Sequence, residues 1–353
     1  MPQITYVIFT VAIALPPVCS SAQSWSVTSL HPSTASRSSA RAASGDQQGG
    51  YISDVNGIYA SIWNGEANSW ENLTPQGTSS EIFGMQGDSQ VGYTSAAPNQ
   101  DEAALWSGSA SSYINLNPAG GHDSRALAVH GNRQGGYARI SGAFRSAILW
   151  SGTASSAVVL STNGTVLGMD ESHQVGQSND HAALWSGTAE SYINLGPAGS
   201  MASSAYAIDG GKQFGSAFFP GQILAGSWEG TASSWTSMHP GTPGGSSIRA
   251  AGGGFQVGYI ENGGPSAQAG IWNGTAASFV NLHSFLSGDY LYSVAEGISV
   301  YEGTIYVVGY AYNQPANVIE AMMWTTPVPE PMTLAATGFC AVWLLRRRGR
   351  GRA

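Results

Sequence analysis

A tryptophan repeat constrains this chain more than any other feature of its sequence. A Trp followed two residues later by Gly occurs six times, and a seventh Trp follows without that Gly. The intervals between successive tryptophans are 43, 44, 35, 43, 44 and 52 residues. The seven positions are Trp63, Trp106, Trp150, Trp185, Trp228, Trp272 and Trp324. Self-similarity at such a period is typical of propellers, solenoids and other repeat architectures.

Two more landmarks occur once per interval. The first is a Gly that closes a short apolar run, with Gln two residues earlier in six of seven cases and Tyr directly after it in five. These glycines are Gly50, Gly92, Gly136, Gly176, Gly215, Gly258 and Gly309. The second landmark is a Leu or Met that precedes a turn. Its seven positions are Leu30, Leu73, Leu116, Leu160, Leu195, Met238 and Leu282. Three independent landmarks that each count seven predict seven structural units.

Each unit is predicted to contain four short strands separated by turn residues. In the repeat around Trp185 these strands cover roughly residues 174–177, 182–185, 192–195 and 204–208. Four-stranded units of about 43 residues are typical of β-propeller blades. Residues 39–43, 124–128 and 204–207 are rich in Ala and Ser, so we expect them to be crowded strands near the axis. The repeat tryptophans are expected between blades, where each buries on the order of 200 Å².

The phase of the repeat predicts how the ring closes. The body opens at Trp25, past the tryptophan landmark, and ends at Trp324, on that landmark. We therefore expect residues 24–30 to form the fourth strand of the blade whose third strand is 321–324. This pairing removes two exposed sheet edges. The predicted fold is an all-β, seven-bladed β-propeller; the alternatives, a β-sandwich or an open solenoid, do not require the last unit to be split.

Charge and cysteine content exclude several classes of function. Charged residues make up 10% of the chain, and residues 25–325 hold 20 acidic and 8 basic side chains, a net charge of −12. Such a surface repels phosphate backbones, which argues against nucleic-acid binding. The two cysteines, Cys19 and Cys340, lie near the chain ends. The predicted propeller therefore has no disulfide and no thiolate metal site.

The first 22 residues have the pattern of a signal peptide. Residues 4–15 form a short apolar run, and Ser20-Ser21-Ala22 provides a small-x-small cleavage site. We expect export with cleavage after Ala22, the alternative being a buried N-terminal strand.

The end of the chain has three parts in a fixed order. Pro329-Glu330-Pro331 precede the apolar stretch 332–345, and Arg346, Arg347 and Arg348 follow it. An apolar stretch of 14 residues is shorter than the roughly 20 that a spanning helix needs. We expect a transient inner-membrane association through 332–345, with the arginines on the cytoplasmic side. The alternative is a permanent anchor with an uncleaved tail.

This arrangement resembles the PEP-CTERM sorting signal of Gram-negative bacteria. The resemblance implies that Pro329, Glu330 and Pro331 form the motif thought to be recognised by a membrane-embedded exosortase. It also implies that the arginines at 346–348 retain the chain until the tail is removed and the protein passes to the cell surface or the exopolysaccharide matrix. The resemblance covers about the last 27 residues.

The body is similar, more loosely, to extracellular repeats named after a His-Ala-Phe signature. His181-Ala182-Ala183-Leu184-Trp185 carries this similarity, and the other units have different residues at the His position. The similarity implies a fold and an extracellular location, and no activity.

Catalytic motifs are absent from the sequence. It has no His-Glu-x-x-His pair, no Gly-x-Ser-x-Gly elbow and no Gly-x-x-x-x-Gly-Lys loop. We interpret the seven histidines as occupying different repeat positions, which argues against a ring-shaped metal site. The adjacent acids at 101–102 and 170–171 would point to opposite faces of a strand, which argues against their acting as a catalytic pair. We interpret Asp54-Val55-Asn56-Gly57 as a hairpin turn rather than a calcium loop. We therefore predict no catalytic, cofactor-binding or metal-binding residue.

The sequence thus divides into a signal peptide (1–22), a propeller domain (23–325) and a sorting tail (326–353). A surface rich in Tyr, Trp, Asn, Gln and Ser suits stacking on sugars and neutral hydrogen bonding. We expect a non-enzymatic scaffold or binding protein of the cell surface or matrix, with an exosortase as processing partner and exopolysaccharide as the favoured ligand. The alternative is a secreted carbohydrate-active enzyme, which needs acids, or an acid and a His, converging at one mouth of the channel with carboxyls about 5–10 Å apart.

Overall fold

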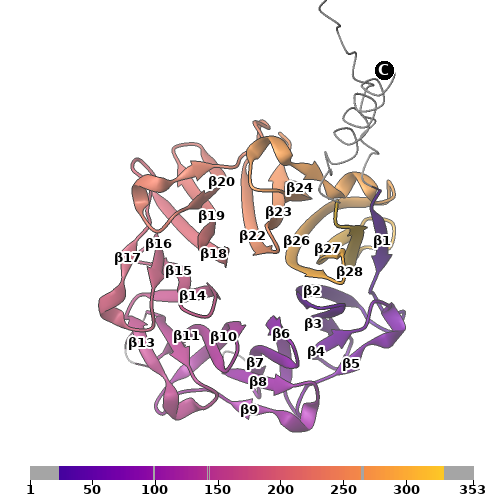
Figure 1. The fold of residues 1–353 in the computed structure, drawn as a ribbon. Coiled ribbons are helices and arrows are strands. Elements are labelled where there is room, and N and C mark those ends of the chain that lie inside the picture. The colour runs from indigo at the N-terminus through magenta and orange to yellow at the C-terminus, as the bar shows by residue number, and fades with distance from the viewer. Residues whose placement is uncertain (1–23, 98–99, 141, 143, 264–265, 330–353) are drawn as a thin grey trace, which may run out of the picture.

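A computed structural model describes residues 24–329 apart from 98–99, 141, 143 and 264–265. Seven four-stranded sheets stand around a common axis, and neighbouring strands within each sheet are antiparallel (Figure 1). The predicted all-β, seven-bladed propeller is confirmed.

The first three blades follow the N-terminal strand β1 (Ser26–Ser29) in order along the chain. Blade 1 consists of β2 (Arg37–Ser44), β3 (Gln47–Ser53), β4 (Ile58–Trp63), η1 (Ala67–Ser69) and β5 (Glu71–Asn72). Blade 2 consists of β6 (Ser79–Gln86), β7 (Ser89–Ser95), β8 (Asp101–Ser107), η2 (Ala110–Ser112) and β9 (Ile114–Asn115). Blade 3 consists of β10 (His122–His130), β11 (Arg133–Arg139), β12 (Ser146–Trp150), η3 (Ala154–Ser156) and β13 (Val158–Ser161).

The remaining blades continue the same pattern. Blade 4 consists of β14 (Gly164–Met169), β15 (Gln174–Ser178), β16 (His181–Trp185), η4 (Ala189–Ser191) and β17 (Ile193–Asn194). Blade 5 consists of β18 (Ala202–Asp209), β19 (Lys212–Phe219), β20 (Gln222–Trp228), η5 (Ala232–Ser234) and β21 (Thr236–Ser237). Blade 6 consists of β22 (Ser246–Gly252), β23 (Phe255–Glu261), β24 (Ala267–Trp272), η6 (Ala276–Ser278) and β25 (Val280–Asn281). After η7 (Leu282–Phe285), blade 7 consists of β26 (Tyr290–Tyr301), β27 (Thr304–Asn313), β28 (Val318–Pro327) and β1.

One strand in the predicted unit belongs to a different blade. The sheet that contains Trp185 is β14–β17, whereas residues 204–208 lie in β18, the innermost strand of the next sheet. The innermost strand follows the outermost strand of the preceding blade after the turn that the Leu or Met landmark introduces, and the repeat has the same period whichever of its turns is taken as the sheet boundary. The prediction that 39–43, 124–128 and 204–207 lie near the axis is correct, because β2, β10 and β18 are innermost (Figure 1).

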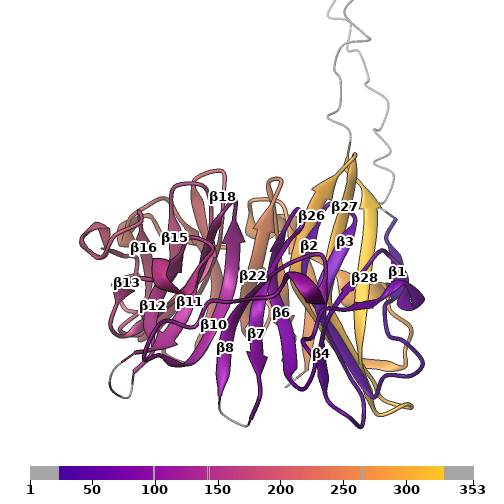
Figure 2. The ribbon, with the colours of Figure 1, turned by 90° about the horizontal axis from the view of Figure 1, so that it is seen from below.

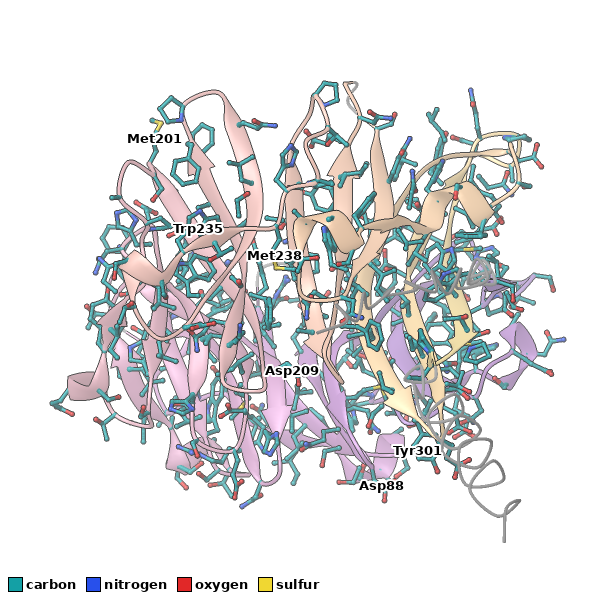
Figure 3. All side chains as sticks on the ribbon, turned by 45° about the horizontal axis from the view of Figure 1, so that its top comes forward. Asp88, Met201, Asp209, Trp235, Met238 and Tyr301 are labelled. Carbon is teal, nitrogen blue, oxygen red and sulfur yellow. The ribbon has the colours of Figure 1, made fainter. Side chains whose placement is uncertain are left out.

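The ring has two distinct faces (Figure 2). We call one the hairpin face, because the tight turns between the first and second strands of each blade lie there. We call the other the connector face, because the links from one blade to the next lie there. Figure 3 shows Asp88, Asp209 and Tyr301 at the hairpin ends of the blades, with Met201 on the other side of the ring.

The ring closes as predicted from the phase of the repeat. Strand β1 pairs with β28 in a register that places Val27 opposite Trp324. The backbone N–H of Leu30 donates to the carbonyl of Ala321 at 2.8 Å, and Leu30 is fully buried. The hydroxyl of Thr326 donates to the carbonyl of Ser24 at 2.9 Å. The two ends of the described chain therefore lie side by side at the hairpin face.

The repeat tryptophans fill the spaces between blades, as expected. Trp63 of blade 1 packs against Leu30, Val308 and Met323 of blade 7. All seven are completely buried. Since a single blade cannot cover this surface alone, each unit depends on its neighbour for its core.

In each of the first six blades, the Gln that precedes the landmark Gly is hydrogen-bonded to a different Gly, the one two residues after the repeat tryptophan. In blade 1 the N–H of Gly65 donates to Oε1 of Gln48 at 2.8 Å. The same bond, at the same length, fixes the loop after the tryptophan in blades 2–6. The Gln therefore serves to hold the loop that leads to the outermost strand.

The landmark Gly on each second strand permits a β-bulge on the innermost strand. A Cβ added to Gly136 would lie 2.0 Å from the carbonyl oxygen of Arg125, and the corresponding glycines of the other blades show the same close approach. Opposite Gly136 the register shifts between Ala126 and Ala128, so the intervening Leu127 is bulged. Only Gly allows the two backbones to come this close.

Serines on the innermost strands connect neighbouring blades. The N–H of Ala321 in blade 7 donates to Oγ of Ser38 in blade 1 at 2.8 Å. Equivalent bonds are accepted by Ser80, Ser124, Ser203, Ser246 and Ser293. Blade 4 instead has Gly164 at this position, as the first residue of its shorter innermost strand, and its first three strands lie within the shortest tryptophan interval.

Candidate functional site in the central channel

The seven bulges place one side chain from each blade around the axis. The bulged residues are Arg41, Phe83, Leu127, Leu167, Tyr206, Arg249 and Glu296, which we call the channel ring. The same seven residues line a cavity of about 160 Å³. They also border a second cavity of about 190 Å³, whose other lining residues follow them on the innermost strands. The channel is therefore bounded by repeat-equivalent residues of all seven blades.

The two ends of the channel differ in chemistry. Toward the hairpin face, the lining consists of small and apolar residues such as Ala43, Met85, Val129 and Ile298. On the connector side of the ring, arginines, carboxylates and tyrosines of the first and second strands gather. The charged and aromatic side chains of the channel therefore lie at the channel ring and on its connector side.

Arg41 is the centre of an ion-pair cluster. Its guanidinium lies 2.8 Å from a carboxylate oxygen of Glu81 and 3.9 Å from one of Glu296. Burial opposes the charge of Arg41, but Glu81 and Glu296 outweigh burial and raise the pKa of Arg41. Burial raises the pKa of Glu81 in spite of the nearby arginine. The cluster thus fixes two acids against one cation inside the channel.

A second pair lies beside this cluster. Arg125 forms an ion pair with Asp101 at 2.5 Å. Its guanidinium also lies over Tyr93, 4.4 Å from the ring centroid, and over Phe83, at 5.6 Å. Such cation–π contacts favour a charged Arg in a partly dehydrated place.

Tyrosines that follow the landmark Gly surround the arginines. They are Tyr51, Tyr93, Tyr137, Tyr259 and Tyr310, each on the second strand of its blade. Burial raises the pKa of Tyr93 and that of Tyr137 to about 12. These hydroxyls therefore stay protonated at neutral pH and can donate hydrogen bonds.

The channel ring was not predicted, although the sequence contains a signal for it. In blades 1–6 the bulged residue lies nine positions before the landmark Gly, as Arg41 does before Gly50; in blade 7 the offset is 13 because the strands are longer. The constant offset is visible only when the bulge is known, because the residue types at this position range from Leu to Glu.

The interpretation of the histidines was wrong in one respect. His31, His239 and His283 share one repeat position, directly after the Leu or Met landmark. In each case Nδ1 lies 2.8–2.9 Å from the hydroxyl of the serine that connects two blades, which is Ser38, Ser246 or Ser293. These three histidines therefore occur at consecutive blade borders because each contacts the serine that connects the two blades there. Within the described part of the chain, no three His, Cys, Asp or Glu side chains lie together as a metal site would require.

The acidic residues that the sequence analysis considered and did not assign to a site take structural positions. Asp101 pairs with Arg125, and Glu102 accepts a hydrogen bond from the side-chain amide of Asn115 at 2.8 Å. Asp170 accepts N–H bonds from Ser172 and His173 in a turn. The carboxylate of Asp54 accepts the N–H of Asn56 at 2.7 Å, as a turn residue does.

Most residues of the predicted processing signals lie outside the described chain. These are the cleavage residue Ala22, the motif residues Glu330 and Pro331, and the cluster Arg346, Arg347 and Arg348. Pro329 is described: it is exposed at the hairpin face and, with Trp25 and Trp272, borders a cavity of about 190 Å³. None of the described helices has the length and hydropathy of a membrane span.

Comparison with known proteins supports the fold. No protein-family model matches the chain, and no curated protein matches it in sequence. Among solved structures, it is similar to the β-propeller domain of the Trilobed protease from Pyrococcus furiosus, with a TM-score of 0.55 and 9% identity over 82% of this chain and 94% of that domain. That domain is described as having an open velcro topology, whereas here β1 closes the ring.

Peptidases with larger chains show the same likeness. A puromycin-hydrolyzing peptidase from Mycobacterium tuberculosis has a TM-score of 0.53 and 14% identity, over 80% of this chain and 52% of its own. A structure from a study of two prolyl endopeptidases has a TM-score of 0.52 and 10% identity, over 84% of this chain and 49% of its own. The present chain spans about half the length of these peptidases, and at such identities the likeness shows the propeller fold alone.

Proposed function

We propose that this protein is an exported, non-enzymatic binding or scaffold propeller that is tethered or sorted through its C-terminal segment and binds polysaccharide of the cell surface or matrix. The observation that carries the proposal is that both ends of the described chain lie at the hairpin face, where Thr326 is bonded to Ser24. A tail that follows Pro329 holds this face toward the membrane. The connector face, with the polar half of the channel, then points away from it.

The resemblance of residues 329–348 to the PEP-CTERM signal supports this orientation. Replacement of Glu330 by Ala is expected to keep the protein in the inner-membrane fraction, because the proline-bracketed acid is the recognition element in that family. Replacement of the exposed Glu66 by Ala removes the same charge at an unrelated site and serves as the control. Equal release of both variants into the surface or matrix fraction would contradict the sorting role.

The orientation has its own test. Val55 is 96% exposed in a turn of the connector face, and Asp88 is exposed in a turn of the hairpin face. Cysteines at these two positions, introduced one at a time into the tail-retaining Glu330→Ala protein with Cys340 replaced by Ser, are to be labelled on spheroplasts with a bulky membrane-impermeant maleimide. We expect faster labelling at position 55 than at 88, and the reverse order would reject the orientation.

A second function is favoured by one specific observation. Glu81 and Glu296 both lie against Arg41 in the channel, and burial raises the pKa of Glu81. Glycosidases require two carboxyl groups, one of them with a raised pKa. Release of reducing sugar from a matrix polysaccharide, abolished by both Glu81→Gln and Glu296→Gln, would favour this enzyme over the binding protein.

A further inference from the structure

The distribution of charge within the propeller is uneven. Residues 25–325 carry a net charge of −12. The innermost strands nevertheless hold half of the eight basic residues of this region but only four of its 20 acids. These basic residues are Arg37, Arg41, Arg125 and Arg249. The innermost strands, which line the channel, thus carry no net charge in an acidic protein, which directs attention to anions.

Arg249 differs from the other channel arginines in its partners. Arg41 is paired with Glu81, and Arg125 with Asp101. Within the described residues, no carboxylate lies within 4.0 Å of the Arg249 guanidinium, and its Nε is buried without a hydrogen-bond partner. Burial opposes the charge of Arg249, but Tyr206, the carboxylate of Glu296 beyond ion-pair distance, and Tyr259 outweigh burial and raise the pKa of Arg249.

Two tyrosines position this guanidinium. The Cζ atom of Arg249 lies 4.7 Å from the ring centroid of Tyr206 and 5.4 Å from that of Tyr259. These cation–π contacts offset part of the cost of burial and restrict the orientation of the side chain. Because Arg249 is a bulged residue of the channel ring, it borders both channel cavities. Its guanidinium is therefore accessible to a small molecule in the channel.

The local charge favours a monoanion. Arg249 supplies one positive charge that forms no direct ion pair among the described residues, and Glu296 of the adjacent blade also borders the cavity and would repel a second negative charge. The planar fork of Arg matches a carboxylate with two parallel hydrogen bonds. Cavities of about 160 and 190 Å³ are smaller than ordinary drug-sized sites, so the ligand must be small.

We propose that the channel binds a small carboxylate at Arg249, with the body of the ligand against Tyr206 and the apolar members of the channel ring. This inference rests on the proposed binding function and names its ligand chemistry. The carboxylate is that of an acidic sugar at the end of a polysaccharide or of a free organic acid. A polymer end, rather than a chain interior, is what cavities of this size accept.

The test is calorimetric titration of the purified protein with glucuronate, with methyl glucoside as the neutral counterpart and inorganic phosphate as the dianionic one. We expect glucuronate to bind, methyl glucoside not to bind, and Arg249→Gln to weaken glucuronate by roughly 10- to 100-fold. Arg37→Gln, which removes an exposed arginine of an innermost strand, is the matched control and should bind as the parent does. Unchanged affinity in Arg249→Gln, tighter binding of phosphate, or no binding of glucuronate would overturn the proposal.

A disaccharide ending in glucuronate distinguishes the two sources of the carboxylate, the end of a polysaccharide and a free organic acid. Competition by this disaccharide identifies a polymer end, and lack of competition in the presence of glucuronate binding identifies a free acid. If Arg249→Gln does not fold, the Arg249 Nε–H resonance of the parent protein is followed by NMR during glucuronate titration, after assignment with Arg249→Lys. We expect that resonance to shift, and a resonance that stays in place refutes the site.

Failure of this inference can be distinguished from failure of the proposed function. Retention on matrix polysaccharide by both the parent and Arg249→Gln, without glucuronate binding, leaves the binding function intact and rejects the channel site. Glucuronate binding without retention on any matrix polysaccharide keeps the site and rejects the polysaccharide function.

Discussion

Blade 7 and blades 1–6 close their sheets by different means. In blades 1–6 a single chain segment forms all four strands, and the Gln–Gly bond fixes the loop before the fourth strand. In blade 7 the corresponding positions are Val307 and Thr326, and the fourth strand, β1, comes from the other end of the chain. The Gln and the Gly that follows the tryptophan are thus both absent from the blade that lacks the loop. This shows that they serve the loop and not the blade as such.

Blade 7 compensates with longer strands. Its strand β26 has 12 residues, and β27 and β28 have 10 each, whereas most other strands have eight or fewer. The hydroxyl of Thr326 bonds to Ser24, so this residue now connects the two chain ends. The predictions below test this contrast, from the largest expected effect to the smallest.

Removal of the closing strand should have the largest effect. A protein that lacks residues 24–30 leaves an open edge on β28 and removes the fully buried Leu30. The loss of one buried Leu alone costs about 2–5 kcal/mol. We expect the unfolding midpoint to fall by more than 10 °C or cooperativity to be lost, as measured by calorimetry. A shortened protein as stable as the parent would show that closure is unimportant.

The bulge glycine should matter equally in both kinds of blade. A Cβ at Gly136 would lie 2.0 Å from a backbone oxygen, and one at Gly309 would lie 1.9 Å from another. We expect Gly136→Ala and Gly309→Ala each to destabilise by about 3 kcal/mol or more, since the backbones must separate. Gly288→Ala is the control, because nothing lies within 4 Å of its added Cβ. Denaturant unfolding measures all three; a neutral Gly136→Ala would reject the steric explanation.

Exchange of Gln and Val tests whether the Gln serves only the loop. Gln134→Val removes the partner of the Gly152 N–H in blade 3 and should cost about 1–3 kcal/mol. Val307→Gln in blade 7 buries an amide where no such loop exists and should also destabilise, by about the same amount. If Val307→Gln stabilised the protein in denaturant titrations, the assignment of the Gln to the loop would be wrong.

The smallest expected effect concerns the histidines at the two borders of blade 7. Burial lowers the pKa of His31, against a raising influence of Glu320, and lowers that of His283. Since the unfolded state binds protons more readily, their contribution is complete above pH 6.5 and is lost as pH falls through the lowered folded values. Asn117 occupies the equivalent position in blade 2. We expect the midpoint difference between pH 8 and pH 5 to shrink by about 1–3 °C in His31→Asn/His283→Asn; an unchanged difference would assign the pH response to other groups.

The repeat predicted the number of blades, the burial of the tryptophans and the closure by β1, because these features depend on periodic apolar and glycine positions. The sequence could not define the sheet boundary near residues 204–208, since a repeat of four strands has the same period whichever of its turns is taken as the boundary. It also could not show that Arg249 has no carboxylate partner, while Arg41 has two. That difference depends on which acids the adjacent blades bring to the axis, as Glu81 and Glu296 do.

The place of β28 within its sheet has a mechanical consequence for a tethered protein. The strand is paired along its whole length with β27 and over four residues with β1, and the chain leaves it at Pro327 along the strand direction. A pull on the C-terminal segment therefore loads both ladders in shear, so that many hydrogen bonds must rupture together instead of one after another. In a tethered protein the force would thus enter at a strand that is paired on both sides.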